Sequence, residues 1–245
     1  MDQYKIRTYL FYAVGEILLV VIGILIALQV NNWNEEKKSR KIEVKLLIEL
    51  KEDLIKTRED LLTDIEKSSI IMNLTDALYK GITEGRANNT DIRLRIPTTY
   101  LTDTPMLFPK LSAYKSIQAF GVNIISNDSL RKSMTDLFEL RMERVTLTES
   151  YLYELDKSAF RPYFRSFSKP DNDCLDCLSL KDQFGSFDRT KQNMFVLNNP
   201  QDDFLHMLKD KYNIMKALEA RYGSLNQQIE EMVNIINQEI KTSND

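Results

Sequence analysis

The sequence predicts a mainly α-helical protein: one N-terminal transmembrane helix, then an elongated antiparallel helical bundle of coiled-coil-like character. Three observations support this fold class. Residues Leu10 to Val30 form a nearly unbroken apolar run. The 245-residue chain has only 7 glycines and 6 prolines, which leaves few turn points and favours long helices. Apolar residues in the remaining chain recur at helical spacing.

The apolar run has the length of a membrane span. Its 21 residues, at about 1.5 Å each, match the roughly 30 Å hydrocarbon core of a bilayer. Only Glu16 and Gln29 interrupt it, each near one end, and Trp33 follows where an interfacial aromatic residue is expected. The run is longer than the core of a cleaved signal peptide and lacks a small-x-small cleavage pattern. We therefore expect a retained anchor, with cleavage or a buried core helix as the alternatives.

Two features inside the span suggest more than anchoring. Gly23 and Ala27 form a small-xxx-small pair that would let two helix backbones approach closely, although such residues are also ordinary in membrane helices. Glu16 is an ionisable group in apolar surroundings, which either reaches the near interface or makes an intramembrane contact. Glu16, Gly23 and Ala27 are therefore the candidate helix–helix contact residues.

The flanking charges leave the orientation open. Lys5 and Arg7 precede the span, whereas a larger group of basic residues follows it: Lys37, Lys38, Arg40, Lys41 and Lys45. The positive-inside rule alone would place the large domain in the cytoplasm, but long domains translocate largely regardless of charge.

The domain organisation follows from the periodicity. We predict a short tail (1–9), the transmembrane helix (10–30) and a helical extramembrane domain (31–245). Within that domain the expected long helices span about 35–82, 128–165 and 200–241, the first nearly continuous with the membrane helix. Irregular segments are expected at 86–109 and 166–199, with one short β element where residues 92–96 alternate. The last helix carries apolar residues seven apart, and Gly223 marks a plausible bend.

Few residues suggest chemistry. Cys174 and Cys177 fit a local disulfide in an oxidising compartment; unpaired thiols and a redox or metal role are the alternatives. His206 is the only histidine, which leaves little material for a catalytic triad, and we expect no metal site and no cofactor. A net charge of −3 provides no basic surface for nucleic acid. Aromatic residues near 151–167 suggest packing at the end of the bundle, or a ligand patch.

Two segments resemble a known family. Tyr9 to Glu35 reads YLFYAVGEILLVVIGILIALQVNNWNE, and a second match joins Ser112–Gly121 (SAYKSIQAFG) to Ile124–Arg131 (IISNDSLR). These segments resemble a family of uncharacterised single-pass membrane proteins of Gram-negative bacteria that carry a domain of unknown function. The resemblance implies a membrane helix with its N-terminus inside and a helical domain outside, and it assigns no activity.

Taken together, these patterns favour a bacterial inner-membrane protein whose C-terminal domain lies in the periplasm. We expect it to act as a membrane-anchored scaffold through protein–protein contacts. Its partners would be the lipid bilayer and a second copy of itself, or another membrane or periplasmic protein. A sensory or ligand-binding module that signals through a partner is the alternative. An enzyme has the least support, because the chain shows no catalytic constellation.

Overall fold

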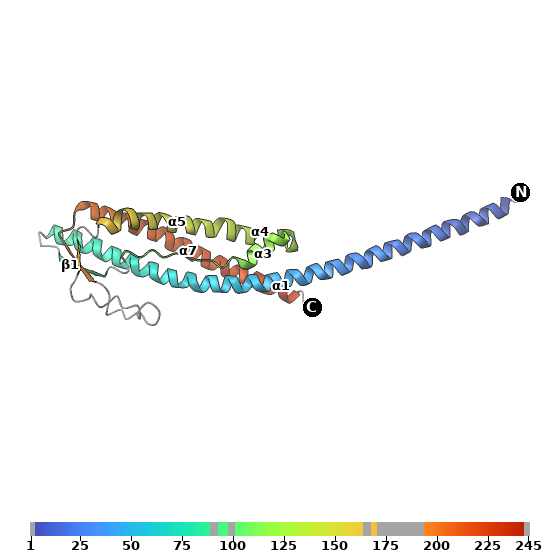
Figure 1. Ribbon diagram of the computed structural model, residues 1–245, viewed down its shortest axis with the longest axis horizontal. Helices are drawn as coiled ribbons and strands as arrows, with labels where there is room; N and C mark the ends of the chain where they lie inside the picture. The colour runs from blue at the N-terminus through green and yellow to red at the C-terminus, as the bar shows by residue number, and fades with distance from the viewer. Residues whose placement is uncertain (1–2, 89–92, 98–100, 164–167, 171–193, 243–245) are drawn as a thin grey trace.

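A computed structural model describes residues 3–88, 93–97, 101–163, 168–170 and 194–242. A long helix projects from an elongated bundle in which two further helical limbs pack against it (Figure 1). The predicted fold class, a long N-terminal apolar helix followed by further helices, is confirmed.

Helix α1 (Gln3–Ala87) joins the apolar run and the first bundle helix in one unbroken element of 85 residues. All residues from Gly15 to Ser39 are exposed, so this part of α1 has no protein around it. From Glu43 onward one face of α1 is buried, and its leucines Leu47, Leu54 and Leu61 are completely covered. Most residues of the outer face are polar, apart from Ile48, Ile55 and Leu62.

The second limb runs alongside α1 in the same direction, as a series of helical pieces: Ser126 bonds Glu43, and Phe160 packs with Leu78. It consists of α3 (Ser112–Phe120), η1 (Val122–Ile124), α4 (Asp128–Asp136), η2 (Leu137–Arg141), α5 (Met142–Leu155) and η3 (Asp156–Phe160). Gly121 ends α3 with a φ of +92°, a conformation that favours glycine, and thereby turns the chain toward α4. Asn127 caps α4, because its side-chain oxygen accepts hydrogen bonds from the backbone N–H groups of Ser129 and Leu130.

Helix α7 (Asp202–Thr242) closes the bundle antiparallel to α1. Three ion pairs define this direction, because residues late in α1 pair with residues early in α7: Arg86–Asp202, Arg58–Glu230 and Arg40–Glu239. The helix begins two residues after Pro200 and continues through Gly223 without the bend that the sequence suggested.

A small sheet lies at the end of the bundle away from the projecting helix (Figure 1). Its strand order is β1 (Arg93–Pro97), β3 (Met194–Asn198), β2 (Ser168–Pro170), and both pairings are antiparallel. The alternating residues 92–96 coincide closely with β1. The other two strands were not predicted, since β3 pairs with β1 about a hundred positions away and with β2 across nearly thirty, and neither pairing leaves a local pattern.

The hydrophobic core consists of two clusters, one after the other along the bundle. The larger, proximal cluster lies toward the projecting part of α1 and includes Leu47, Met134, Leu152, Met215 and Ile229. The smaller, distal cluster consists of six buried residues: Leu78, Ile82, Leu101, Phe160, Phe204 and Leu208.

Candidate functional site

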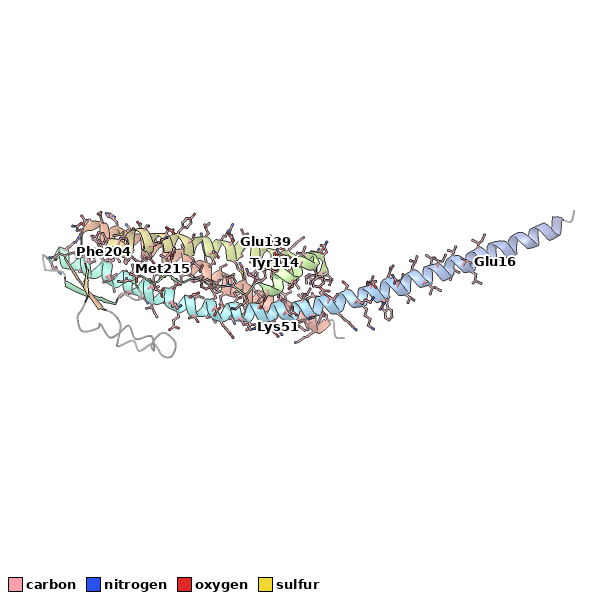
Figure 2. All side chains as sticks on the ribbon, viewed as in Figure 1. Glu16, Lys51, Tyr114, Glu139, Phe204 and Met215 are labelled. Carbon is pink, nitrogen blue, oxygen red and sulfur yellow. The ribbon has the colours of Figure 1, made fainter. Side chains whose placement is uncertain are left out.

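The three residues predicted for helix–helix contact lie on the exposed part of α1. Figure 2 shows Glu16 far from the bundle, on the projecting helix. Gly23 follows Glu16 by seven residues and Ala27 follows Gly23 by four, so the three residues share one face of α1. A methyl group added at Gly23 would meet nothing within 4 Å. This face is therefore free to contact lipid or another helix.

A polar layer separates the two hydrophobic clusters inside the bundle. On α1, Thr75 lies between Ile71 of the proximal cluster and Leu78 of the distal cluster. Asp156 divides the second limb in the same way, between Leu152 and Phe160, and Lys211 divides α7 between Met215 and Leu208. Each of the three helices thus contributes one buried polar residue at the boundary.

An ion pair forms the centre of this layer, which we call the ion-pair layer. The Nζ of Lys211 donates to Oδ1 of Asp156 at 2.6 Å and to Oδ2 at 2.7 Å, and both side chains are 0% exposed. Thr104 Oγ1 also donates to Asp156 Oδ2, at 2.7 Å. The Lys211 ammonium lies 5.1 Å from the centre of the Phe160 ring. Burial raises the pKa of Asp156 and lowers the pKa of Lys211, while the attraction between the two charges opposes both changes.

The end of α5 positions Asp156 for this contact, because Asp156 follows buried Glu149 by seven residues and buried Leu152 by four. After Leu152 and Asp156, regular α-helical spacing would next bury Ala159, but the buried residue is Phe160. A π-turn holds one more residue than an α-helical turn, so it moves the inward face by one position. This shift brings Phe160, rather than Ala159, into the core beside Lys211.

A second polar layer lies closer to the projecting helix. The Oε1 atom of Glu149 accepts hydrogen bonds from the Tyr222 hydroxyl at 2.5 Å and from the Leu107 backbone N–H at 3.0 Å. Burial raises the pKa of Glu149, and burial together with the Glu149 carboxylate raises the pKa of Tyr222. Asp64 is also buried on α1, and the loss of water around it raises its pKa to about 6, against the effect of nearby Lys67.

Both layers hold an extended segment, residues 102–110, which we call the strap. It links the sheet region to α3 and contacts the helices through polar groups at short intervals. In addition to the Thr104 and Leu107 bonds, Arg161 donates to the carbonyl oxygen of Thr102, and the Lys110 N–H donates to Thr57 Oγ1 at 2.9 Å. The Glu149 carboxylate and the Thr57 hydroxyl thus accept hydrogen bonds from backbone N–H groups that an extended segment cannot pair within itself.

Burial raises the pKa of these carboxylates, as it does for many catalytic groups, but they do not line a surface groove. Two surface grooves of about 420 and 360 Å³ lie between α7 and the second limb, and their linings do not include Asp64, Glu149 or Asp156. Among the residues that the structure describes, no group of three or more His, Cys, Asp or Glu side chains could hold a metal ion. The geometry therefore indicates that the buried charges hold the strap and the helices in register.

The remaining predicted residues divide between the surface, the core and the undescribed part of the chain. His206 is exposed on α7. Phe160 and Tyr163 pack against Phe204, with ring centres 5.7 and 5.5 Å apart, and close the distal end of the core. Cys174 and Cys177 lie outside the described residues, so their disulfide stays a prediction.

The buried polar residues were missed by the sequence analysis although a signal was present. Lys211 falls on the apolar stripe of α7, between Leu208 and Met215, and Asp64 occupies a corresponding position on α1, three residues after Leu61. A charged residue at a core position indicates a buried partner, because an unpaired charge is strongly unfavourable there.

Comparison with known proteins identifies the family without adding a function. The part of the chain that the structure describes contains one helix, α1, long and apolar enough to cross a membrane, and no residue of its apolar window is buried. No curated protein and no solved structure matches the chain. The predicted membership of an uncharacterised domain family is confirmed: residues 16–163, more than half of the chain, match a family of unknown function (DUF6090), and the chain belongs to that family.

Proposed function

We propose that this chain is a single-pass membrane protein whose helical bundle serves as a scaffold for protein–protein contacts. The main support is the continuity of α1, which runs without a break from the exposed apolar stretch into the packed core. An apolar helical surface of this length is stable only in lipid or against other protein. The exposed residues 31–39 then hold the bundle about 14 Å beyond the span.

The compartment is part of the same proposal. The resemblance of the N-terminal segment to Gram-negative membrane proteins supports the bacterial inner membrane, with the bundle in the periplasm. Trp33 is exposed directly after the span, and Lys37 lies 5.2 Å from its ring centre, an arrangement typical of the membrane interface. Protease treatment of spheroplasts tests the orientation: a periplasmic bundle loses a C-terminal tag, whereas a cytoplasmic bundle retains it.

The membrane contact is proposed to involve the face of Glu16, Gly23 and Ala27. Small residues at Gly23 and Ala27 permit close helix approach, and a polar group such as Glu16 is favourable in lipid when it meets a partner. The partner is a second copy of the chain, or another membrane or periplasmic protein. No catalytic step is assigned to the chain.

Substitution of the small residues tests this contact. The variant Gly23→Leu/Ala27→Leu should lower the yield of chemically crosslinked oligomers in native membranes, because the larger side chains separate the backbones. Leu25→Phe is the matched control, since residue 25 lies on the opposite face of the same helix. Equal crosslinking of all three proteins in the membrane fraction would refute the contact. Recovery of the full chain in the soluble fraction would refute the membrane assignment.

A further inference from the structure

Three apolar side chains lie on the outer face of α1 within the bundle. Ile48, Ile55 and Leu62 are 39%, 40% and 45% exposed, and they are seven residues apart. Each directly follows a fully buried leucine, so α1 has one apolar stripe in the core and a second stripe about 100° around the helix. We call Ile48, Ile55 and Leu62 the outer stripe. A spacing of seven residues is the repeat by which two helices pack along their length.

Charges of opposite sign flank the outer stripe. Lys51 and Arg58 follow Ile48 and Ile55 by three residues, which places them about 60° to one side. Glu52 and Glu59 follow the same two residues by four, which places them about 40° to the other side. Figure 2 shows Lys51 on the bundle part of α1. Arg58 also reaches α7, where it bonds Asn226 and Glu230.

This arrangement is complementary to itself. When two copies of α1 are related by a two-fold axis parallel to the helices, the basic flank of one copy faces the acidic flank of the other. At equal height along the axis, Lys51 then lies nearest to Glu52 of the second copy, since the two positions differ by one residue, about 1.5 Å of rise. An antiparallel pair would bring different residues together.

Membrane insertion, as proposed above, supplies the parallel register. Two copies that enter the same membrane in the same direction present α1 at the same height. Ala27 precedes Ile48 by 21 residues, three repeats of seven, so the small-residue face in the span and the outer stripe form one seam when the two helices supercoil to the left. The seam is polar at Asn34 and Lys41, where the helix lies between the membrane and the bundle.

We propose that the outer stripe is the contact surface of a parallel homodimer, in which a second copy of this chain packs α1 against α1. Ile48, Ile55 and Leu62 of the two copies pair about the two-fold axis, and the flanking charges hold the register. This inference rests on the proposed membrane insertion and goes beyond it, since it places the contact in the extramembrane bundle.

Cysteine crosslinking of the full chain in lipid vesicles tests the dimer. In a background of Cys174→Ser/Cys177→Ser, single variants Ile48→Cys, Ile55→Cys and Leu62→Cys should form disulfide dimers on mild oxidation. The reason is that a disulfide requires Cβ atoms about 4 Å apart, which only residues at the seam reach. Lys56→Cys and Asp60→Cys are the controls: both residues are exposed, but they lie well to one side of the stripe. The stripe positions should react roughly tenfold faster than the controls.

A charge exchange tests the register independently. In the Ile55→Cys background, Lys51→Glu should lower dimer formation roughly fivefold, because the new carboxylate faces Glu52 of the other copy twice per dimer. The double variant Lys51→Glu/Glu52→Lys should restore it.

The outcomes separate this inference from the proposed function. Equal reaction at stripe and control positions, or an unchanged rate in Lys51→Glu, would overturn the homodimer through the outer stripe. Dimers that form through Ala27→Cys but not through Ile55→Cys would also overturn it, while the membrane contact would stand. If the chain does not insert into vesicles, the proposed function fails, and the homodimer that rests on it fails with it.

Discussion

Replacement of Asp64 by asparagine should stabilise the bundle, and the gain should depend on pH. Asp64 is 5% exposed on the inward face of α1, and burial raises its pKa from 3.8 to about 6. A rise of this size corresponds to about 3 kcal/mol of unfavourable free energy for the charged form in the folded state. Asp64→Asn removes the charge and keeps the shape, so up to about 3 kcal/mol of stability should be gained at pH 8.

The sign of the pH dependence follows from the direction of the change. Below pH 3.8 the carboxyl is protonated in both states and contributes no penalty. Between 3.8 and about 6 the unfolded chain ionises first, so folding stability falls as pH rises; above about 6 the penalty is constant. The gain from Asp64→Asn should therefore be full at pH 8 and vanish by about pH 4.

Urea unfolding of the full chain in detergent micelles, followed by circular dichroism, measures this difference. Glu59→Gln is the matched control, because Glu59 lies five residues earlier on α1 and is exposed. The control should change stability by less than about 0.5 kcal/mol at either pH. A gain for Asp64→Asn that is equal at pH 4 and pH 8, or a loss at pH 8, would refute the argument from burial.

Further predictions concern the other buried polar groups, and the same unfolding assay checks each one. Lys211→Met should lower stability by about 3–5 kcal/mol at pH 7, since it leaves Asp156 as an uncompensated buried charge. The double variant Lys211→Met/Asp156→Leu should recover most of this loss. Equal losses of stability in the single and double variants would contradict the prediction. Tyr222→Phe removes one donor from Glu149 and should cost about 1–3 kcal/mol. Ser68→Ala should be neutral or stabilise by about 1 kcal/mol, because the buried Ser68 hydroxyl has no hydrogen-bond partner among the described residues.

The regular helices could be predicted from the sequence because their signal is local. On α7, the apolar residues seven apart from Leu208 to Ile236 are all buried, as the periodicity indicated. The polar layers could not be predicted in the same way. The contact of Asp156 with Lys211 joins residues 55 positions apart, which leaves no periodic pattern. Gly223 lies inside a continuous helix. The parts of α7 before and after it both pack against the bundle, and this packing outweighs the weak helix propensity of one glycine.

The polar layers also explain how an extended segment holds its place in a helical bundle. A helix is fixed by side chains that interlock with its neighbours, whereas the strap has fewer such contacts and could shift along the groove. Its hydrogen bonds at Thr104, Leu107 and Lys110 reach acceptors on η3, α5 and α1. Each acceptor lies at a fixed position along the bundle axis. A shift of the strap would take the buried Leu107 N–H away from its acceptor, at a cost of about 1–3 kcal/mol. The buried carboxylates therefore lower the stability of the bundle through desolvation but specify a single register for the strap.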